Sequence, residues 1–238
     1  MKKSEKEITI YAKIGNPAGL QQAIEIYDQE QAQNRAPNGR IRVRMERKRG
    51  NPAWDYTLTT KENFTSGGGM QDCEEDTEVI NLHVYEMFKR VCDVFQRKVR
   101  YVFKVEQISL NAPGLTGALQ VPELKYEVDH FITATGEFSS WCKIDVEIDA
   151  LMEAMQKANL DTNKPLDLKL KLSSLPFQPT DFFMEDPNNP KSKELISAIF
   201  DKEFNRPVKP ELAPATERVA PKTFRESMGD ALIAAWKA

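Results

Sequence analysis

Charged side chains recur at every second position in several short segments, and each segment is dominated by one sign. Arg40, Arg42 and Arg44 alternate in one segment, and Lys98 and Arg100 alternate in another. Later segments alternate carboxylates, which are Glu127, Asp129, Asp145, Glu147 and Asp149. An arginine fork donates two parallel hydrogen bonds to phosphate, and carboxylates are preferred ligands of magnesium and manganese. These residue types suit the binding of a phosphate chain accompanied by a divalent cation.

Strands are the elements that would position these charges, because successive side chains of a strand point to opposite faces. Apolar residues fill the intervening positions, as Ile41 and Val43 do between the arginines. The alternation predicts strands at residues 7–14, 40–48, 54–61, 73–79, 98–106, 123–131, 141–149 and 166–172.

Segments with helical periodicity lie between some of these predicted strands. Asn16 can cap a helix that Pro17 opens, with an apolar face that continues to Tyr27. A second apolar stripe, from Ile80 to Phe95, predicts a helix after the acidic strand. Shorter helices are expected at 150–159 and 193–204.

Two packings explain the sorted charges equally well. In a two-faced antiparallel sheet, the charged faces would lie in water. In a closed barrel they would line the interior. Like charges 4 Å apart repel by about 4 kcal/mol at an effective dielectric constant near 20, so an enclosed cluster needs opposite charge between its members. A phosphate chain would neutralise the cations, and a divalent ion the carboxylates.

Composition excludes several classes of function. The 238 residues include 33 basic and 36 acidic side chains, giving a net charge of -3, which argues against general nucleic-acid or membrane-surface binding. The cysteines, Cys73, Cys92 and Cys142, favour buried free thiols over a disulfide framework or a zinc site. With only His83 and His130 available, a metal would be bound by carboxylates.

The order of these segments resembles the CYTH family, or triphosphate tunnel metalloenzymes, which includes class IV adenylate cyclases, thiamine triphosphatases and inorganic triphosphatases. The segments R-I-R-V-R, Y-T-L-T-T-K and D-C-E-E-D-T-E are similar to consecutive strands of the family. K-V-R-Y resembles its K-x-R-Y, Y-E-V-D-H-F its W-E-V-D-x-F, and K-I-D-V-E-I-D its A-E-I-E. The likeness runs from about Glu7 to Phe204.

This resemblance implies an α+β fold, an antiparallel eight-stranded β-barrel or tunnel with flanking helices. It implies a phosphohydrolase that depends on Mg²⁺ or Mn²⁺ and acts on an inorganic or organic triphosphate. The implied phosphate-binding residues are Arg42, Arg44, Lys61, Lys98 and Arg100. The implied metal ligands are Glu7, Glu127, Asp129, Asp145 and Glu147, of which Glu7, Asp145 and Glu147 would also be catalytic.

The opening motif departs from the family. E-I-T-I-Y matches the family's E-x-E-x-K only at Glu7, with Thr9 in place of the second glutamate and Tyr11 in place of the lysine. Threonine is a weaker metal ligand than a carboxylate, and tyrosine brings no positive charge. Two alternatives to hydrolysis therefore stay open. One is a catalytically degenerate module that binds a nucleotide, polyphosphate or RNA 5′-triphosphate, or serves an assembly. The other is a nucleotidyl cyclase.

The chain divides by composition into three parts. We expect a tunnel domain at 1–206, a proline-rich linker at 207–221 and an amphipathic helix or interaction tail at 222–238. The tail could fold back onto its own domain or dock on a protein partner. No apolar run reaches the roughly 18 residues of a membrane span, and the N-terminus lacks an apolar signal core, so a cytoplasmic protein is expected.

Overall fold

The computed structural model describes residues 3–36, 39–67, 70–111, 117–133, 135–160, 172, 175–185 and 190–203. Its strands are β1 (Lys3–Ile14), β2 (Glu25–Ala36), β3 (Gly39–Lys48), β4 (Asp55–Gly67), β5 (Met70–Val79), β6 (Val94–Asn111), β7 (Ala118–Ile132), β8 (Phe138–Glu147) and β9 (Pro179–Met184). Its helices are the 3₁₀ helix η1 (Pro17–Gln22) and the α-helices α1 (Leu82–Val91), α2 (Asp149–Lys157) and α3 (Pro190–Glu203).

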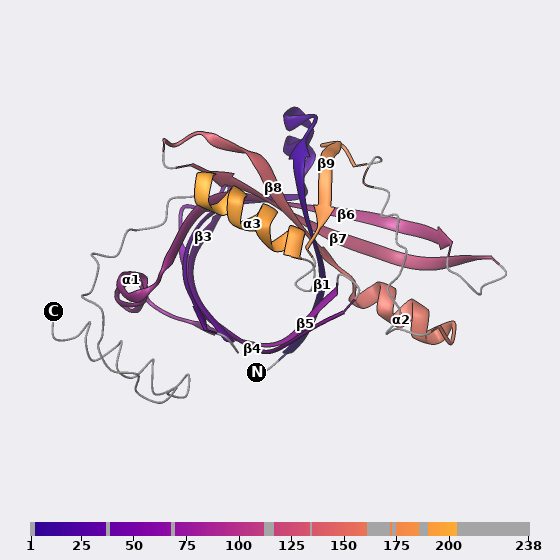
Figure 1. Ribbon diagram of the computed structural model, residues 1–238, viewed down its shortest axis with the longest axis horizontal. Helices are drawn as coiled ribbons and strands as arrows, with labels where there is room; N and C mark the ends of the chain where they lie inside the picture. The colour runs from indigo at the N-terminus through magenta and orange to yellow at the C-terminus, as the bar shows by residue number, and fades with distance from the viewer. Residues whose placement is uncertain are drawn as a thin grey trace.

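The strands form one antiparallel sheet that closes on itself. Their order is β5-β4-β3-β2-β6-β7-β8-β1-β9, and β5 also pairs with β1. One edge of β1 pairs with β8, and its other edge pairs first with residues 70–75 and then with β9. Strands β1 to β8 therefore make a closed ring, with β9 added outside it (Figure 1). The expected eight-stranded antiparallel barrel is confirmed.

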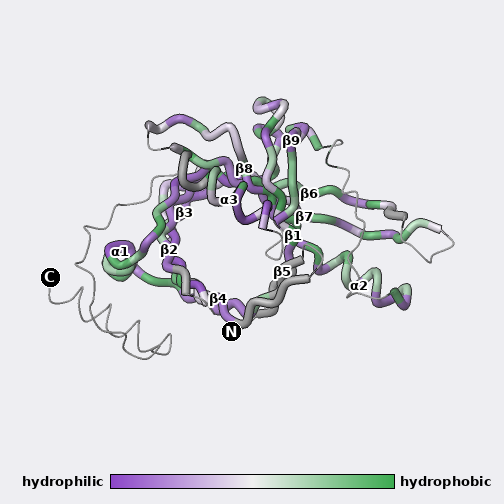
Figure 2. Tube along the Cα trace, in the orientation of Figure 1, coloured by the Kyte–Doolittle hydropathy of each residue, from purple (hydrophilic) through white to green (hydrophobic). Residues whose placement is uncertain are grey.

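The hydrophobic core lies outside this ring. Ile10, Val128 and Ile144 pack with Leu151 of α2 and with Phe177 in one cluster. A second cluster places Tyr85 and Phe88 of α1 on Ala32 and Val43. Polar and apolar residues alternate along the strands between them (Figure 2). The apolar faces pack against helices, and the opposite faces are left to line the interior.

The expected helix from Asn16 to Tyr27 is wrong. Only the short η1 forms there, and β2 begins at Glu25, between β3 and β6. The residues of β2 are good helix formers, but hydrogen bonding to two neighbouring strands overrides that preference. Strand β9 was also not predicted, and Phe95 belongs to β6 rather than to α1.

The remaining expectations divide into two groups. The strands predicted at 7–14, 40–48, 54–61, 73–79, 98–106, 123–131 and 141–149 are present, as are helices close to 150–159 and 193–204. The last of these strands ends earlier than expected, at Glu147, and Asp149 belongs to α2 instead of the charged strand face. The strand expected at 166–172 falls almost entirely outside the described residues, and so do the linker at 207–221 and the tail at 222–238. Within the described ranges, no helix is long and apolar enough to cross a membrane.

Candidate functional site: a charged cavity inside the barrel

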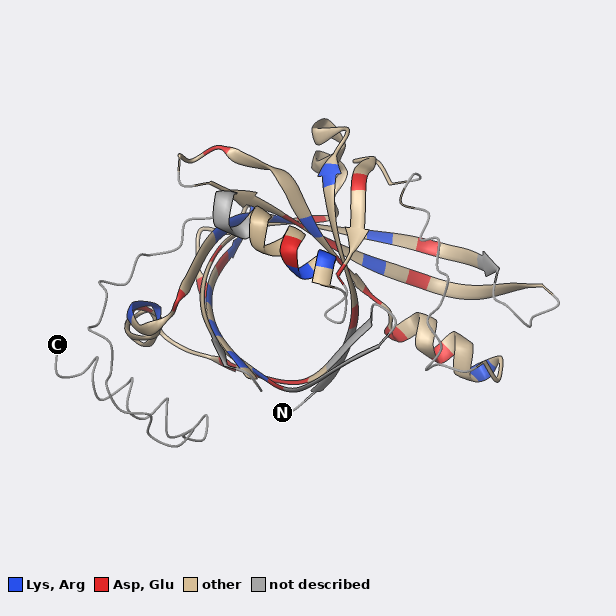
Figure 3. Cartoon of the chain, viewed as in Figure 1, with Lys and Arg blue, Asp and Glu red and all other residues tan. Residues whose placement is uncertain are grey.

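A cavity of about 250 Å³ lies inside the ring and takes lining residues from all eight of its strands. Charged positions of both signs are distributed over these strands (Figure 3). Every predicted phosphate-binding or metal-binding residue lines this cavity. They are Glu7, Arg42, Arg44, Lys61, Lys98, Arg100, Glu127, Asp129, Asp145 and Glu147.

The burial of these side chains decides between the two packings considered for the charged faces. Lys61 is 6% exposed, Lys98 4%, Asp145 4% and Asp129 0%. An outward-facing sheet surface would leave such side chains in water, so that alternative is wrong. The alternation of the sequence had assigned each of them to the correct face.

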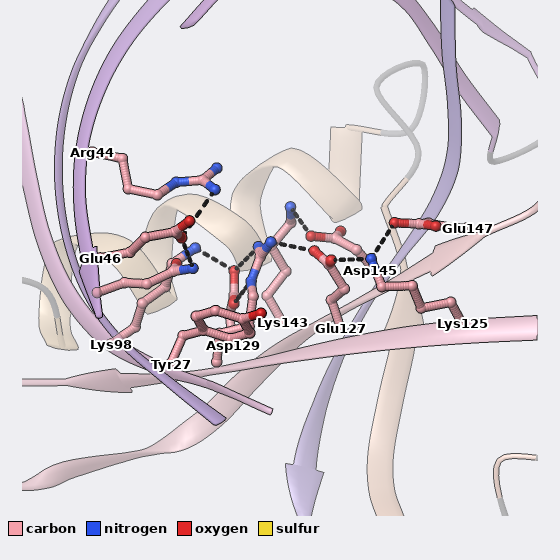
Figure 4. Close-up of polar contacts among 12 residues, drawn as sticks. Tyr27, Arg44, Glu46, Lys98, Lys125, Glu127, Asp129, Lys143, Asp145 and Glu147 are labelled. Atoms are coloured by element: carbon pink, nitrogen blue, oxygen red, sulfur yellow. Dashed lines mark hydrogen bonds and ion pairs between the residues drawn. The ribbon is translucent and has the colours of Figure 1, made fainter. Parts of the chain in front are cut away.

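Asp129 is the centre of the acidic side of the cavity. Arg100 donates to both of its oxygens, from Nε at 2.7 Å and from Nη2 at 2.9 Å. Lys98 donates a further hydrogen bond to Oδ2 (Figure 4). Burial would raise the pKa of Asp129, but Arg100 and Lys98 outweigh it and hold that pKa well below its usual range. The remaining guanidinium nitrogen of Arg100 bonds to Glu127.

Lys98 is a weaker base than Arg100. Burial lowers its pKa to about 7, and the positive charges of Arg100 and Arg44 lower it as well, although Asp129 raises it. Arg100, in contrast, is held charged: Asp129 and Glu127 raise its pKa despite burial. Lys98 is therefore the cation of the cavity that can lose its proton near neutral pH.

Asp145 is also fully engaged. The hydroxyl of Thr9 donates to Oδ1 at 2.7 Å, and the ammonium of Lys143 donates to Oδ2 at 2.6 Å. Thr9 and Asp145 face each other across β1 and β8, and Lys143 faces Tyr11. Burial would lower the pKa of Lys143, but Asp145 and Glu7 raise it, so it stays positively charged. Lys143 thus places a cation beside Tyr11, where the family's lysine would stand.

Glu7 and Glu147 are the acidic pair best suited to a metal ion. They face each other across β1 and β8, and Glu147 is 45% exposed, with Oε1 accepting from Lys125 at 2.7 Å. Asp129 accepts three hydrogen bonds from protein donors and Asp145 accepts two, so part of the lone-pair capacity of each carboxylate is already used. Magnesium commonly takes one or two carboxylates and completes its shell with phosphate and water. No cluster of three candidate ligands occurs among the described residues.

The basic side of the cavity is less well neutralised. Arg44 lies 3.5 Å from Glu46, Arg42 lies 4.0 Å from Glu75, and Lys61 lies 2.9 Å from the same Glu75. The Nε atoms of Arg42 and Arg44 are buried and have no hydrogen-bond partner in the part of the chain that the structure describes. Burial, together with Arg42 and Arg100, lowers the pKa of Arg44 to about 10. This wall favours an incoming anion.

β9 and α3 cover part of one end of the barrel (Figure 1). Tyr11, Phe131 and Ile199 form a small apolar cluster there, with Ile196 and Phe183 packed against it. Ile196 also lines the cavity. The sequence predicted the helix that carries Ile196 but not β9, which is short and shows no clear alternation.

Comparison with known proteins finds matches among solved structures. No family model matches the chain, and no curated protein does. Among solved structures, the chain is similar to a putative adenylyl cyclase from Hippeastrum described as having a dominant triphosphatase activity. The two are 16% identical over 65% of this chain and 87% of that one, with a TM-score of 0.37. It is also similar to the PH1819 protein of Pyrococcus horikoshii OT3, at 16% identity over 64% and 86%, with a TM-score of 0.40. The assignment of the fold here stands on the strand pairing itself.

Proposed function

We propose that this protein binds the triphosphate group of a small molecule inside its barrel, with Arg42 and Arg44 as the principal phosphate ligands. The observation that carries this proposal is a pair of arginines on one face of β3 whose side chains are 15% and 16% exposed and whose buried Nε–H groups have no hydrogen-bond partner among the described residues. Buried charges normally have partners, because an unpaired one loses its hydration without compensation.

The spacing of the two arginines suits a chain of phosphates rather than one. Positions 42 and 44 are two residues apart on a strand, which separates their backbone positions by about 7 Å along the lumen. Lys61 continues the basic wall on β4, opposite Arg40. A polyanion lying along this wall would relieve the repulsion among its cations and satisfy both Nε–H groups.

The test is calorimetric titration with tripolyphosphate. Wild type is expected to bind it, and a variant with Arg42→Met and Arg44→Met to lose about a hundredfold or more in affinity. Arg47→Met is the matched control, because Arg47 lies on the same strand, pairs with Asp28 and is not part of the cavity. Absence of binding by wild type, or equal losses in the two variants, contradicts the proposal.

A second candidate function is hydrolysis of the bound triphosphate, and the facing Glu7 and Glu147 favour it. These two carboxylates would hold Mg²⁺ or Mn²⁺, which when bound supplies positive charge to the phosphoryl group under attack. Arg42, Arg44 and Lys143 would orient the phosphates and keep their charge neutralised, so the contribution of the protein is placement.

Phosphate release from tripolyphosphate, ATP and thiamine triphosphate, with each metal in turn, tests this second function. Turnover should exceed that of a variant carrying Arg42→Ala and Glu147→Ala. Equal rates would leave binding alone as the function. Cyclic nucleotide among the products would be needed to support a nucleotidyl cyclase.

A further inference from the structure

Three large apolar side chains are exposed close together on β9 and α3, outside the barrel. Phe182 is 55% exposed, Leu195 46% and Met184 37%. The hydroxyl of Ser192 donates to the backbone oxygen of Met184 at 3.4 Å, so the first turn of α3 lies beside the end of β9 (Figure 1). Leu195 is about one helical turn beyond Ser192. We call Phe182, Met184 and Leu195 the β9–α3 patch.

The patch is separate from the apolar contacts that β9 already makes. Phe183 stacks on Tyr11, with ring centroids 5.5 Å apart, and meets the edge of Trp141 at 5.8 Å. Because neighbouring residues of a strand point to opposite sides, Phe182 and Met184 face away from these rings. β9 is also the last strand in the sheet order, so within the described ranges its outer edge has no neighbouring strand.

Such a surface calls for a cover. Exposed apolar side chains scattered singly are ordinary, whereas a gathered group marks a site of contact. Edge strands with apolar side chains are normally paired or covered, because they otherwise promote aggregation. The partner that suits the β9–α3 patch has one apolar face to set against it and one polar face to leave in water.

The end of the chain has this chemistry. Phe224, Met228, Leu232 and Trp236 recur every four residues, and together they would form one apolar face of a helix. Residues 204–238 lie outside the described residues. Helices in proteins gain most of their stability by packing an amphipathic face against the rest of the fold. This segment therefore requires an apolar surface in order to become a stable helix.

The length of the connecting chain allows the segment to reach the patch. α3 ends at Glu203, and twenty residues lie between Glu203 and Phe224. A flexible linker of this length spans about 25 Å on average, and α3 itself is about 21 Å long. Tethering also gives the segment an effective concentration in the millimolar range, far above that of a separate copy of the chain. The tail of the same chain is thus favoured over a second molecule.

We infer that residues 222–238 form an amphipathic helix that packs its apolar face on the β9–α3 patch of the same chain. α3 carries Ile196, which lines the cavity, and Ile199, which packs on Tyr11 and Phe131 at the end of the barrel. The docked tail braces this end of the barrel from outside. The inference is independent of the proposed function, since no ligand enters the argument.

A double-mutant cycle on the full chain, read by thermal unfolding, gives the first test. One variant changes the patch, with Phe182→Ser and Leu195→Ser, and another changes the tail, with Met228→Ser and Leu232→Ser. Each should lower the Tm by about 4 °C or more, and all four changes together should lower it no further than either pair alone. Additive losses, or a patch variant with the Tm of wild type, would overturn the inference.

Two control variants are matched to these changes. Ile24→Ser with Leu82→Ser removes two apolar side chains that are 57% and 51% exposed and lie outside the patch. Glu226→Ser with Asp230→Ser changes the tail at the same spacing, on the opposite side of the expected helix. Both controls should shift the Tm by less than about 2 °C. A loss in a control equal to that in its matched variant would contradict docking on the patch.

Cross-linking locates the tail directly, without depending on stability. The three native cysteines are buried, so a short bismaleimide should join only introduced ones. Lys193→Cys, exposed on α3, combined with Lys237→Cys should give a link within one chain at least about tenfold faster than Lys157→Cys with Lys237→Cys. Lys157 is 80% exposed at the end of α2. Equal rates for the two pairs, or links only between two chains, would overturn the inference.

Discussion

Arg100 donates two hydrogen bonds to Asp129, from Nε at 2.7 Å and from Nη2 at 2.9 Å, across the paired strands β6 and β7. The resemblance to a metalloenzyme family had implied that Asp129 binds a metal and Arg100 a phosphate. In the structure each neutralises the other, with Asp129 fully buried and the side chain of Arg100 11% exposed. The pair therefore organises the wall of the cavity, and ligand binding by the arginines of β3 is the proposal tested below.

Asp129→Asn should be strongly destabilising. The amide keeps the shape of the carboxylate but leaves Lys98 buried without its counter-charge and Arg100 with Glu127 alone, a kind of defect that typically costs about 3 to 5 kcal/mol. Urea denaturation measures the change. Glu123→Gln is the matched control on the same strand, because its pair with Lys104 is about half exposed and should contribute less than about 1 kcal/mol. Similar losses in both variants would contradict the structural role.

Arg44→Met should raise the stability of the ligand-free protein and weaken its binding of tripolyphosphate. Removing a buried cation that burial, Arg42 and Arg100 all disfavour is expected to stabilise the ligand-free protein by about 1 kcal/mol. Glu46 keeps a partner in that variant, since it also accepts from Gln29 at 2.8 Å. Tripolyphosphate at a hundred times its dissociation constant should stabilise wild type by about 2.7 kcal/mol, and Arg44→Met by far less. Thermal unfolding with and without the ligand measures both; a variant that loses stability and keeps binding would refute the assignment.

Triphosphate affinity should fall as the pH rises from about 7.5 to 9.5. The pKa of Lys98 is about 7 in the ligand-free protein, and a nearby polyanion favours the charged ammonium, so binding takes up a proton in this range. The limiting slope is about tenfold in affinity per pH unit for one proton. The phosphates themselves are fully ionised there. Calorimetry in two buffers of different ionisation enthalpy counts the protons, and Lys98→Met should abolish the uptake; an unchanged slope in that variant would assign it elsewhere.

Manganese binding should depend on Glu147 and not on Asp145. Manganese titrated into the tripolyphosphate complex is expected to bind wild type and Asp145→Asn, because Asp145 is already bonded to Thr9 and Lys143. Glu147→Gln should weaken manganese binding by about tenfold or more, since it removes one of two facing carboxylates. Chelator should abolish hydrolysis, if present, and leave part of the tripolyphosphate binding. Loss of the metal in Asp145→Asn alone would restore the ligand set implied by the family.

The sequence was informative where the two faces of a strand differ strongly. In β3 the arginines alternate with Ile41 and Val43, so both the strand and the direction of each side chain could be predicted. The same contrast identified the lining residues of β6, β7 and β8. Where charged and aliphatic residues alternate, the direction of each side chain is well determined, because turning the strand over would bury unpaired charges in the hydrophobic core and expose its aliphatic residues.

Strand β2 could not be found in this way. Gln29, Gln31 and Gln33 face inward, and a neutral amide is neither clearly apolar nor charged, so the period of two is hidden. The segment also has high helix propensity. The segment is a strand because it pairs with two others. One is β3, which follows it along the chain after a turn, and the other is β6, which is distant in sequence.

The sequence could not predict which individual charges pair with each other. Alternation placed Arg100 and Asp129 on inward faces, but it did not set them opposite each other. That depends on the register of β6 against β7. The same holds for Thr9 and Asp145. Which carboxylates remain available to a metal is therefore a property of the closed barrel.

Closure through the first strand has a consequence for biosynthesis. β1 is translated before all of its partners, which are residues 70–75, 141–147 and 179–184. Until these are translated, a nascent chain presents unpaired strand edges, and contacts so far apart in sequence form slowly. A chain truncated before Pro179 would leave the edge from Ile10 to Ile14 without its partner strand. Such truncations should accumulate in inclusion bodies, whereas slow translation at low temperature should favour the native barrel.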